Sequence, residues 1–307
     1  MIRSFAIACL VLAACRGKEL PRPAQSVQQP QPEVDPWNVP PVDALDVLRA
    51  SDVDYVVARQ SFRTQLVRET PSPQRWEAVK VAADAREVGF QSDGVTLRAW
   101  VSPESKTKRP AVLFLHGGFA FGLDDWEMTK PFRDAGYIVM MPILRGENGS
   151  PGTFSLYYNE LNDVLAAAKV LEQRSDVEQT RIFVTGHSAG ATLATLAALV
   201  SSTFRAAAPF SAQTAVIADE PALVPFNASN AEEIRMRSAV VFASSFKCAT
   251  RLYYGDQEDW AKASTEETAR RAKAAGRNVE AVVVPGDHFS MLDTAVPAAI
   301  AFFDQQR

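Results

Sequence analysis

Cysteine and histidine are both scarce in this chain of 307 residues, which contains three of each. No cluster of His, Cys, Asp and Glu has the spacing of metal ligands, so we expect no metal and no cofactor. The net charge is only -4, acids and bases are interspersed, and no basic block occurs. Nucleic acid is therefore not an expected partner. The longest purely apolar run, residues 5–14, is too short to cross a bilayer as a helix.

That run instead has the layout of a secretory signal, because Arg3 precedes it and small residues end it. The sequence Leu12-Ala13-Ala14-Cys15 resembles the lipobox of bacterial lipoproteins. The resemblance implies a signal peptide over residues 1–14 and a lipid, such as palmitate, on Cys15. It also implies a membrane-anchored lipoprotein of the bacterial cell envelope, facing the periplasm or the exterior. Ordinary signal cleavage and an uncleaved anchor are the alternatives.

The remaining chain divides by composition. Residues 15–42 are rich in Pro and Gln and poor in apolar residues, which predicts a lipidated tether. Residues 43–80 are predicted to be a helical segment of unknown role, and residues 81–307 to be one α/β domain. A lipidated mature protein would keep only Cys248, which excludes an intramolecular disulfide. We interpret Cys248 as a buried structural thiol.

Strand and helix patterns alternate through the predicted domain. Strands at 86–91 and 95–101 flank Ser92-Asp93-Gly94, a hairpin turn signal. The run 111–115 is continuously apolar, as expected of a strand covered on both faces. Similar strands, separated by amphipathic helices, follow to the end of the chain. The pattern predicts a doubly wound, mostly parallel sheet with an antiparallel leading hairpin.

Two features of the later part carry specific expectations. An apolar insertion at about 211–248 interrupts the alternation and is interpreted as a lid or pocket wall, or else as an extra core helix. The sequence Ser264-Thr265-Glu266-Glu267 reads as a capping box that opens a helix, and Gly276 is expected to close that helix.

The most informative motif is Gly186-His187-Ser188-Ala189-Gly190, which stands between a β-rich apolar run and an Ala/Leu-rich helix former. A strand, a Gly-x-Ser-x-Gly turn and a helix form a nucleophile elbow, in which the serine is exposed at the tip. The N–H of Ala189 then points at the place where an oxyanion develops. We predict that Ser188 is a catalytic nucleophile.

A nucleophilic serine needs a base, and the elbow directs His187 away from the hydroxyl. His288 follows the last strand, at the strand-end face where ligands of such sheets bind. It is therefore the predicted base, whereas His116 is interpreted as structural. An orienting acid is expected after the strand that ends at Gly255, where Asp256, Glu258 and Asp259 are all candidates.

Residues 86–307 resemble an α/β-hydrolase, closest to the prolyl oligopeptidase/dienelactone hydrolase branch. The resemblance rests on the elbow and on four further motifs: His116-Gly117-Gly118, the run 144–149, the run 254–260 and Gly286-Asp287-His288. It implies that the acid lies three residues after the strand-ending glycine, which selects Glu258, with Asp259 as the alternative acid. It also implies oxyanion donors at the N–H groups of Gly118 or Phe119, beside that of Ala189.

These residues together predict a serine hydrolase that cleaves a carboxylic ester through an acyl-enzyme. A peptidase or amidase acting on short peptides is the alternative. Peptide-cleaving relatives usually carry a gating β-propeller, and we expect none in the roughly 70 residues before the domain. A third reading is a binding module on an inactive hydrolase fold. The expected partners are a small ester or a short peptide and, through the lipid, a membrane.

Overall fold

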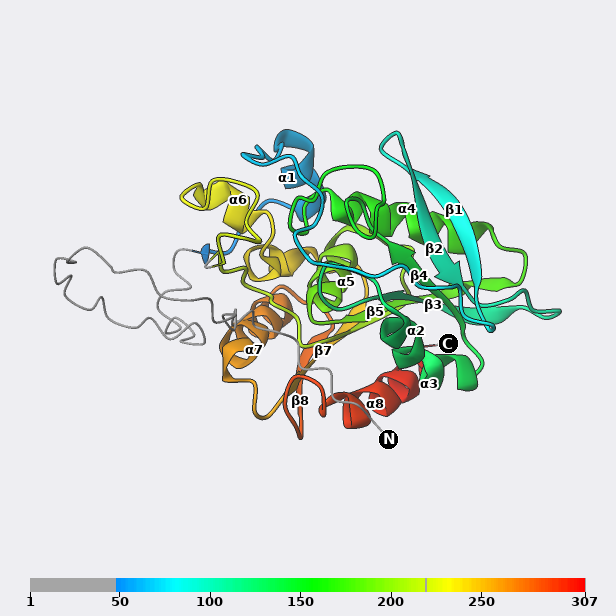
Figure 1. Cartoon of the computed structure of the whole chain (residues 1–307). Helices are drawn as coiled ribbons and strands as arrows, with labels where there is room; N and C mark the ends of the chain where they lie inside the picture. The colour runs from blue at the N-terminus through cyan, green and yellow to red at the C-terminus, as the bar shows by residue number, and fades with distance from the viewer. Residues whose placement is uncertain (1–47, 219, 307) are drawn as a thin grey trace, which may run out of the picture. The chain divides into compact units, whose positions relative to one another are not determined.

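The centre of the molecule is an eight-stranded sheet, seen in a computed structural model that describes residues 48–218 and 220–306 (Figure 1). The strand order is β1-β2-β4-β3-β5-β6-β7-β8. The strands are β1 (Arg86–Ser92), β2 (Val95–Val101), β3 (Arg109–Leu115), β4 (Ile138–Ile143), β5 (Val177–His187), β6 (Ala206–Phe210), β7 (Ala249–Gly255) and β8 (Val279–Val284). The signal, Cys15 and the tether lie outside the described residues.

The pairing of the strands confirms the predicted fold class. β1 and β2 form an antiparallel hairpin at one edge, with Asp93 and Gly94 at positive φ in the turn. β2 is antiparallel to β4, and every later neighbour from β4 to β8 is parallel. The carboxyl ends of the parallel strands therefore share one edge, which is where the predicted site residues lie.

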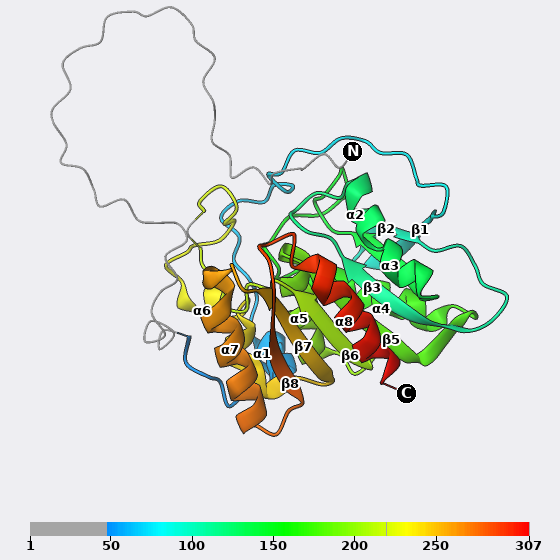
Figure 2. The ribbon, with the colours of Figure 1, turned by 90° about the horizontal axis from the view of Figure 1, so that it is seen from below.

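Helices cover both faces of the sheet. Both faces of the sheet carry apolar side chains: in β3, Val112 and Phe114 join one core cluster, while Leu113 and Leu115 join the other. Figure 2 views the face covered by α8, with α2 and α3 beside it. α4 and α5 pack on the opposite face. The helices are α1 (Tyr55–Ser61), α2 (Leu123–Met128), α3 (Lys130–Asp134), α4 (Glu160–Gln173), α5 (Ala189–Val200), α6 (Ala231–Arg235), η2 (Ala239–Ser245), α7 (Asp259–Ala274) and α8 (Leu292–Asp304).

The helical prediction for residues 43–80 is wrong over most of its described length. The only α-helix there is α1, whose buried Tyr55 packs on Phe242 with ring centroids 4.7 Å apart. We call residues 64–76, which follow in extended form, the strap. Val67 N–H donates to Pro225 O over 2.7 Å, and Leu66 forms an isolated bridge with Phe226. The strap's backbone forms hydrogen bonds with the insertion, and not the internal hydrogen bonds of a helix.

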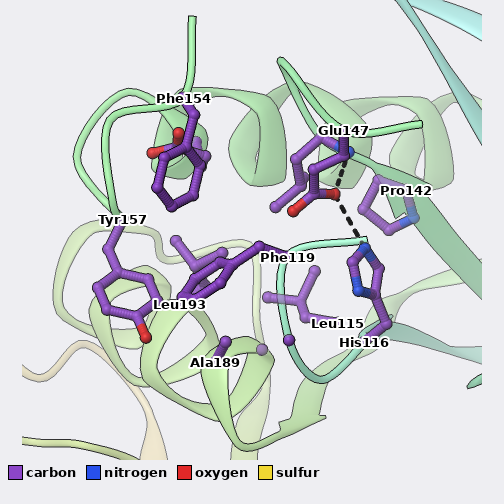
Figure 3. Close-up of a pocket in the computed structure, with 13 residues that line it drawn as sticks. Leu115, His116, Phe119, Pro142, Glu147, Phe154, Tyr157, Ala189 and Leu193 are labelled. Carbon is purple, nitrogen blue, oxygen red and sulfur yellow. Dashed lines mark hydrogen bonds and ion pairs between the residues drawn. The ribbon is translucent and has the colours of Figure 1, made fainter. Parts of the chain in front are cut away.

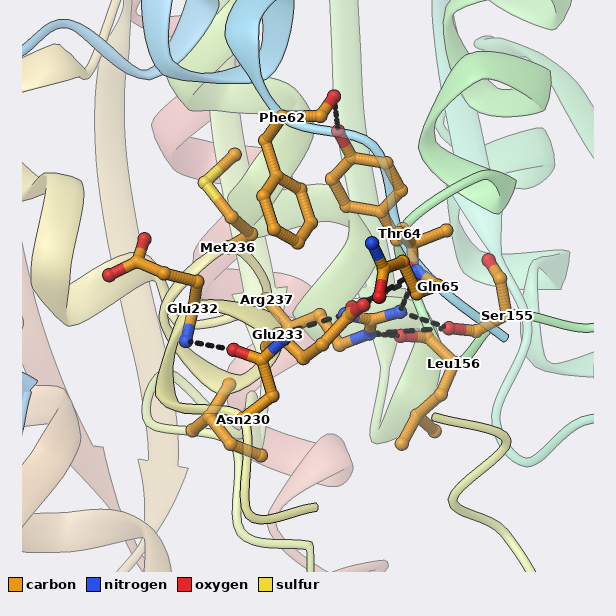
Figure 4. A network of polar contacts seen from close by, with 12 residues as sticks. Phe62, Thr64, Gln65, Ser155, Leu156, Asn230, Glu232, Glu233, Met236 and Arg237 are labelled. Carbon is orange, nitrogen blue, oxygen red and sulfur yellow. Dashed lines mark hydrogen bonds and ion pairs between the residues drawn. The ribbon is translucent and has the colours of Figure 1, made fainter. Parts of the chain in front are cut away.

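The insertion at 211–248 is partly core. The η2 segment is buried and joins the main apolar cluster. This part of the insertion is therefore an extra core helix and not a lid. Between α6 and η2 lies Arg237, which is fully buried and paired with Glu233 at 2.6 Å. The Arg237 guanidinium also donates to the carbonyls of Ser155 and Leu156 (Figure 4). The guanidinium and the carboxylate of this buried pair thus both have hydrogen-bond partners, which buried charges require.

The predicted capping box is a second error. α7 begins at Asp259 with Glu258 as its N-cap, so Ser264 lies inside the helix, where its hydroxyl donates to Ala261 O. Gly276, at φ 73°, does follow the end of this helix. Cys248 is a free, partly buried thiol, and burial raises its pKa to about 12. Among the described helices, none has the length and apolar character to span a membrane.

Candidate active site

Ser188 stands at the tip of a tight turn between β5 and α5. Its backbone has φ 55° and ψ -117°, which few residues other than glycine adopt, and its side chain is partly exposed. The flanking glycines permit this turn. A Cβ added at Gly190 would lie 2.1 Å from Leu115 O, and one added at Gly186 would lie 2.6 Å from the same oxygen. The strain at Ser188 is therefore imposed by the fold around it.

Glu258 and His288 meet at the same strand edge. Glu258 Oε1 lies 2.6 Å from His288 Nδ1, and the Glu258 side chain is only 2% exposed. Asp259 is exposed, and Asp256 Oδ1 instead accepts the N–H of Gly286 over 2.8 Å. The geometry thus separates the three candidate carboxylates, and Glu258 is the one that contacts the imidazole.

Two more donors hold the Glu258 carboxylate. Gly255 N–H donates to Oε2 over 2.7 Å, and the Ser211 hydroxyl donates to the same oxygen. Burial by itself raises the pKa of Glu258, but the hydrogen bonds from His288, Ser211 and Gly255 outweigh it and leave the pKa lowered. Glu258 is therefore an ionised acceptor. The sequence reasoning missed Ser211; its position directly after a buried strand was the available signal.

His187 links the elbow to the loop of the predicted base. Its Nε2 lies 2.7 Å from the backbone oxygen of His288, and the two rings are 4.5 Å apart. Because a carbonyl only accepts, Nε2 carries the proton. Burial, followed by the charge of His288, lowers the pKa of His187 to about 4, so the ring is neutral. Between Ser188 and His288 themselves, both described, no hydrogen bond is formed.

His116 has a structural environment. Its Nε2 lies 3.0 Å from Glu147 Oε2, and both side chains are 2% exposed (Figure 3). Burial by itself lowers the pKa of His116, but the Glu147 carboxylate outweighs it and raises the pKa to about 9. Glu147 also accepts the N–H of Leu144. The pair braces the loops after β3 and β4 against each other.

The loop after β3 lies beside Ser188. A Cβ added at Gly117 would lie 3.7 Å from Ser188 Cβ, and Gly118 has φ 64°. Phe119 N–H donates over 2.7 Å to Gln74 Oε1, from the strap. The N–H of Ala189, in the first turn of α5, has no acceptor within its helix. Three residues named from the sequence as donors, Gly118, Phe119 and Ala189, thus line one cavity, and the Phe119 N–H is occupied by a side chain that sequence reasoning did not single out.

A small cavity adjoins these groups, lined mainly by apolar side chains (Figure 3). Phe119 packs edge-on against Phe154, with ring centroids 5.0 Å apart, and lies 5.8 Å from the ring of Tyr157. The cavity holds about 10 Å³, the room one water molecule needs. Within the described part of the chain, no group of His, Cys, Asp and Glu could hold a metal ion.

The profile of the Alpha/beta hydrolase family matches residues 112–301, more than half of the chain. The protein therefore belongs to the alpha/beta hydrolase family. No curated protein sequence matches it significantly.

Solved structures share its fold at low identity. Pyrococcus horikoshii acylaminoacyl peptidase has a TM-score of 0.61 and 19% identity, over 72% of this chain and 41% of its own. A Mycobacterium tuberculosis puromycin-hydrolyzing peptidase has a TM-score of 0.63 and 20% identity, over 72% of this chain and 40% of its own. The esterase Est22, solved with p-nitrophenol, has a TM-score of 0.56 and 17% identity, over 72% of this chain and 80% of its own. The chain thus spans about two fifths of the two peptidases.

Proposed function

We propose that this protein is a serine hydrolase that cleaves a carboxylic ester, with Ser188 as nucleophile, His288 as base and Glu258 as the acid. The observation that carries the proposal is the buried Glu258 carboxylate, held by two other donors and 2.6 Å from His288 Nδ1. A carboxylate so placed keeps a proton on Nδ1 and leaves Nε2 free to accept one. The strained Ser188 at the adjoining strand end supports the nucleophile assignment.

The reaction proceeds in two half-reactions. Ser188 Oγ turns toward His288, as apo hydroxyls commonly do only when substrate binds, and attacks the ester carbonyl while its proton passes to Nε2. Glu258 stabilises the imidazolium, and the N–H groups of Ala189 and Phe119 hold the oxyanion. The C–O bond to the alcohol breaks, and the alcohol leaves with the proton from His288. Water then attacks the acyl carbon while His288 takes its proton, the bond from that carbon to Ser188 Oγ breaks, and His288 returns the proton to Oγ as the carboxylic acid leaves.

The apolar lining of the cavity beside the elbow supports an ester with a small apolar acyl group, for which the cavity must widen beyond its volume of about 10 Å³. The rings of Phe119, Phe154 and Tyr157 form its wall, and the charged groups that line it, His116, Glu147 and Glu160, already have partners. Cleavage of short peptides is the second candidate. It is supported by the fold shared with the acylaminoacyl and puromycin-hydrolyzing peptidases, and it would use the same residues.

Covalent labelling of the full-length protein with a fluorophosphonate probe tests the proposal. We expect labelling at Ser188 and none in Ser188→Ala. A panel of p-nitrophenyl esters and short peptide amides then separates the two candidates, since an esterase turns over only the first set. Absence of labelling in folded protein would reject the nucleophile and favour an inactive binding module.

We also propose that the protein is a lipoprotein of the bacterial cell envelope, modified at Cys15. The support is the lipobox-like sequence before that residue. Metabolic incorporation of an alkyne-tagged palmitate analogue should label the protein and spare Cys15→Ser. Equal labelling of both proteins would reject the site.

A further inference from the structure

Both backbone groups of Phe119 are bound by side chains of the strap. Phe119 N–H donates to Gln74 Oε1 over 2.7 Å, and Phe119 O accepts the Ser72 hydroxyl over 2.6 Å. Neither strap residue belongs to the motifs that predicted the site, nor to the part of the chain that the family profile matches. The strap therefore contacts the proposed oxyanion loop at Phe119, one of the two residues whose N–H groups are proposed to hold the oxyanion.

The backbone of the strap near Gln74 is fixed. Ser72 N–H donates to Gly146 O over 2.9 Å, and Thr70 O accepts the N–H of Phe154 over 3.0 Å. These bonds tie the strap to the loop after β4, on the far side of Phe119 from the elbow. Gln74 can thus leave Phe119 by a change of side-chain rotamer, without any movement of the strap.

The other end of the strap is anchored in the buried network of Figure 4. Gln65 N–H and the Thr64 hydroxyl donate to the Glu233 carboxylate, which is also paired with Arg237. Because breaking a buried ion pair is costly, this end is the stable one. The strap's backbone is thus held at both ends, whereas the Gln74 side chain is exposed.

Gln74 itself is exposed, and its Oε1 accepts the Phe119 N–H. The carboxamide lies directly over Gly118, where an added Cβ would be 2.8 Å from Oε1. A side chain at position 118 would therefore exclude Gln74 from Phe119. The contact depends on the same bare glycine backbone that an oxyanion loop needs in order to approach a reacting carbonyl.

Resting on the proposed function, we propose that Gln74 is a specificity-determining residue, whose Oε1 occupies the Phe119 N–H that the substrate's oxyanion requires. One N–H serves one strong acceptor, so substrate must displace Gln74. An amide oxygen accepts a hydrogen bond better than an ester oxygen, and an oxyanion accepts better than either. Gln74 thus weakens binding of the ground-state ester, whereas the transition state takes the donor. A substrate therefore needs stronger contacts elsewhere in the site than it would need without Gln74.

Three variants of the full-length protein test this. Gln74→Met keeps the length of the side chain and removes the acceptor. It should raise kcat/KM for a p-nitrophenyl ester, and the rate of fluorophosphonate labelling at Ser188, by about fivefold, the factor expected of one net hydrogen bond. Gln74→Glu keeps an acceptor and adds charge beside the oxyanion, so both rates should fall about tenfold or more. Arg75→Ala, at the next exposed position, should leave both rates unchanged.

The outcomes separate this inference from the function it rests on. If the wild-type protein labels at Ser188 but Gln74→Met is equal to it or slower, with an unchanged melting temperature, then Gln74 does not compete for the donor. A slower Gln74→Met would instead assign Gln74 to holding the loop in place. If the wild-type protein fails to label, the nucleophile assignment fails and the inference falls with it.

Discussion

Replacement of Glu258 by glutamine tests the acid through the tautomer of His288. In the structure, Oε2 receives two hydrogen bonds, from Gly255 and Ser211, whereas Oε1 receives one, from His288. The glutamine amide has one oxygen and one NH2 group. Placing its oxygen at the Oε2 position satisfies the two donors and turns the NH2 group toward His288 Nδ1.

The NH2 group can only donate, so Nδ1 must give up its proton and Nε2 must carry it. That imidazole cannot take the proton of Ser188. The opposite orientation would leave the buried Gly255 N–H facing another donor, which costs about 1–3 kcal/mol. We therefore expect kcat for an ester to fall about 10⁴-fold, which corresponds to about 5.5 kcal/mol in the barrier.

The assay is steady-state ester hydrolysis together with the melting temperature, which should change little. Asp259→Asn is the matched control, since Asp259 is exposed and is the neighbouring candidate acid. We expect it to keep kcat within about twofold of wild type. A Glu258→Gln enzyme within tenfold of wild type, or an equal loss in Asp259→Asn, would refute the assignment.

Three further predictions concern stability. The pKa of His116 is about 9 in the folded protein and 6.5 in the unfolded chain, so its pair with Glu147 contributes about 3 kcal/mol to the free energy of unfolding below pH 6.5. This contribution is lost as the pH rises through about 9. Urea unfolding at a series of pH values should show the loss, and Glu147→Gln should make the profile flatter. Gly190→Ala places a Cβ 2.1 Å from Leu115 O and should cost about 3 kcal/mol or more, measured likewise, and near-wild-type stability would contradict the packing argument. Ser188→Gly relieves the positive φ and should be about 1 kcal/mol more stable than Ser188→Ala; an Ala variant of equal stability would argue against strain.

The parts of the fold that were predictable from sequence are those with a local signal. The hairpin turn at 92–94, the continuous apolar strands and the glycine elbow each carry a pattern within a few residues, and each is where the pattern indicates. The contact of Glu258 with His288 could be predicted because the ends of the parallel strands converge on one edge of the sheet. The spacing after the strand-ending glycine in the family then selects one of the three carboxylates.

The errors arose where distant contacts decide local structure. α7 begins at Asp259 and not at the Ser264 capping box, because Glu258 is fixed by His288 and Ser211, from two distant segments, and the helix continues directly from it. The strap is extended because its backbone pairs with Pro225, more than 150 positions away. A helix without tertiary packing has little stability of its own, so such pairing prevails.

The strap also bears on how this enzyme could acquire a new substrate. It lies outside residues 112–301, which match the family profile, yet two of its side chains contact Phe119 in the proposed site. A side chain at either glycine of the elbow would collide with the backbone, so these glycines cannot be replaced. Gln74 and its exposed neighbours carry no such restriction. Variation in substrate preference can therefore accumulate in a few exposed residues near the amino terminus, while the groups that perform the chemistry stay as they are.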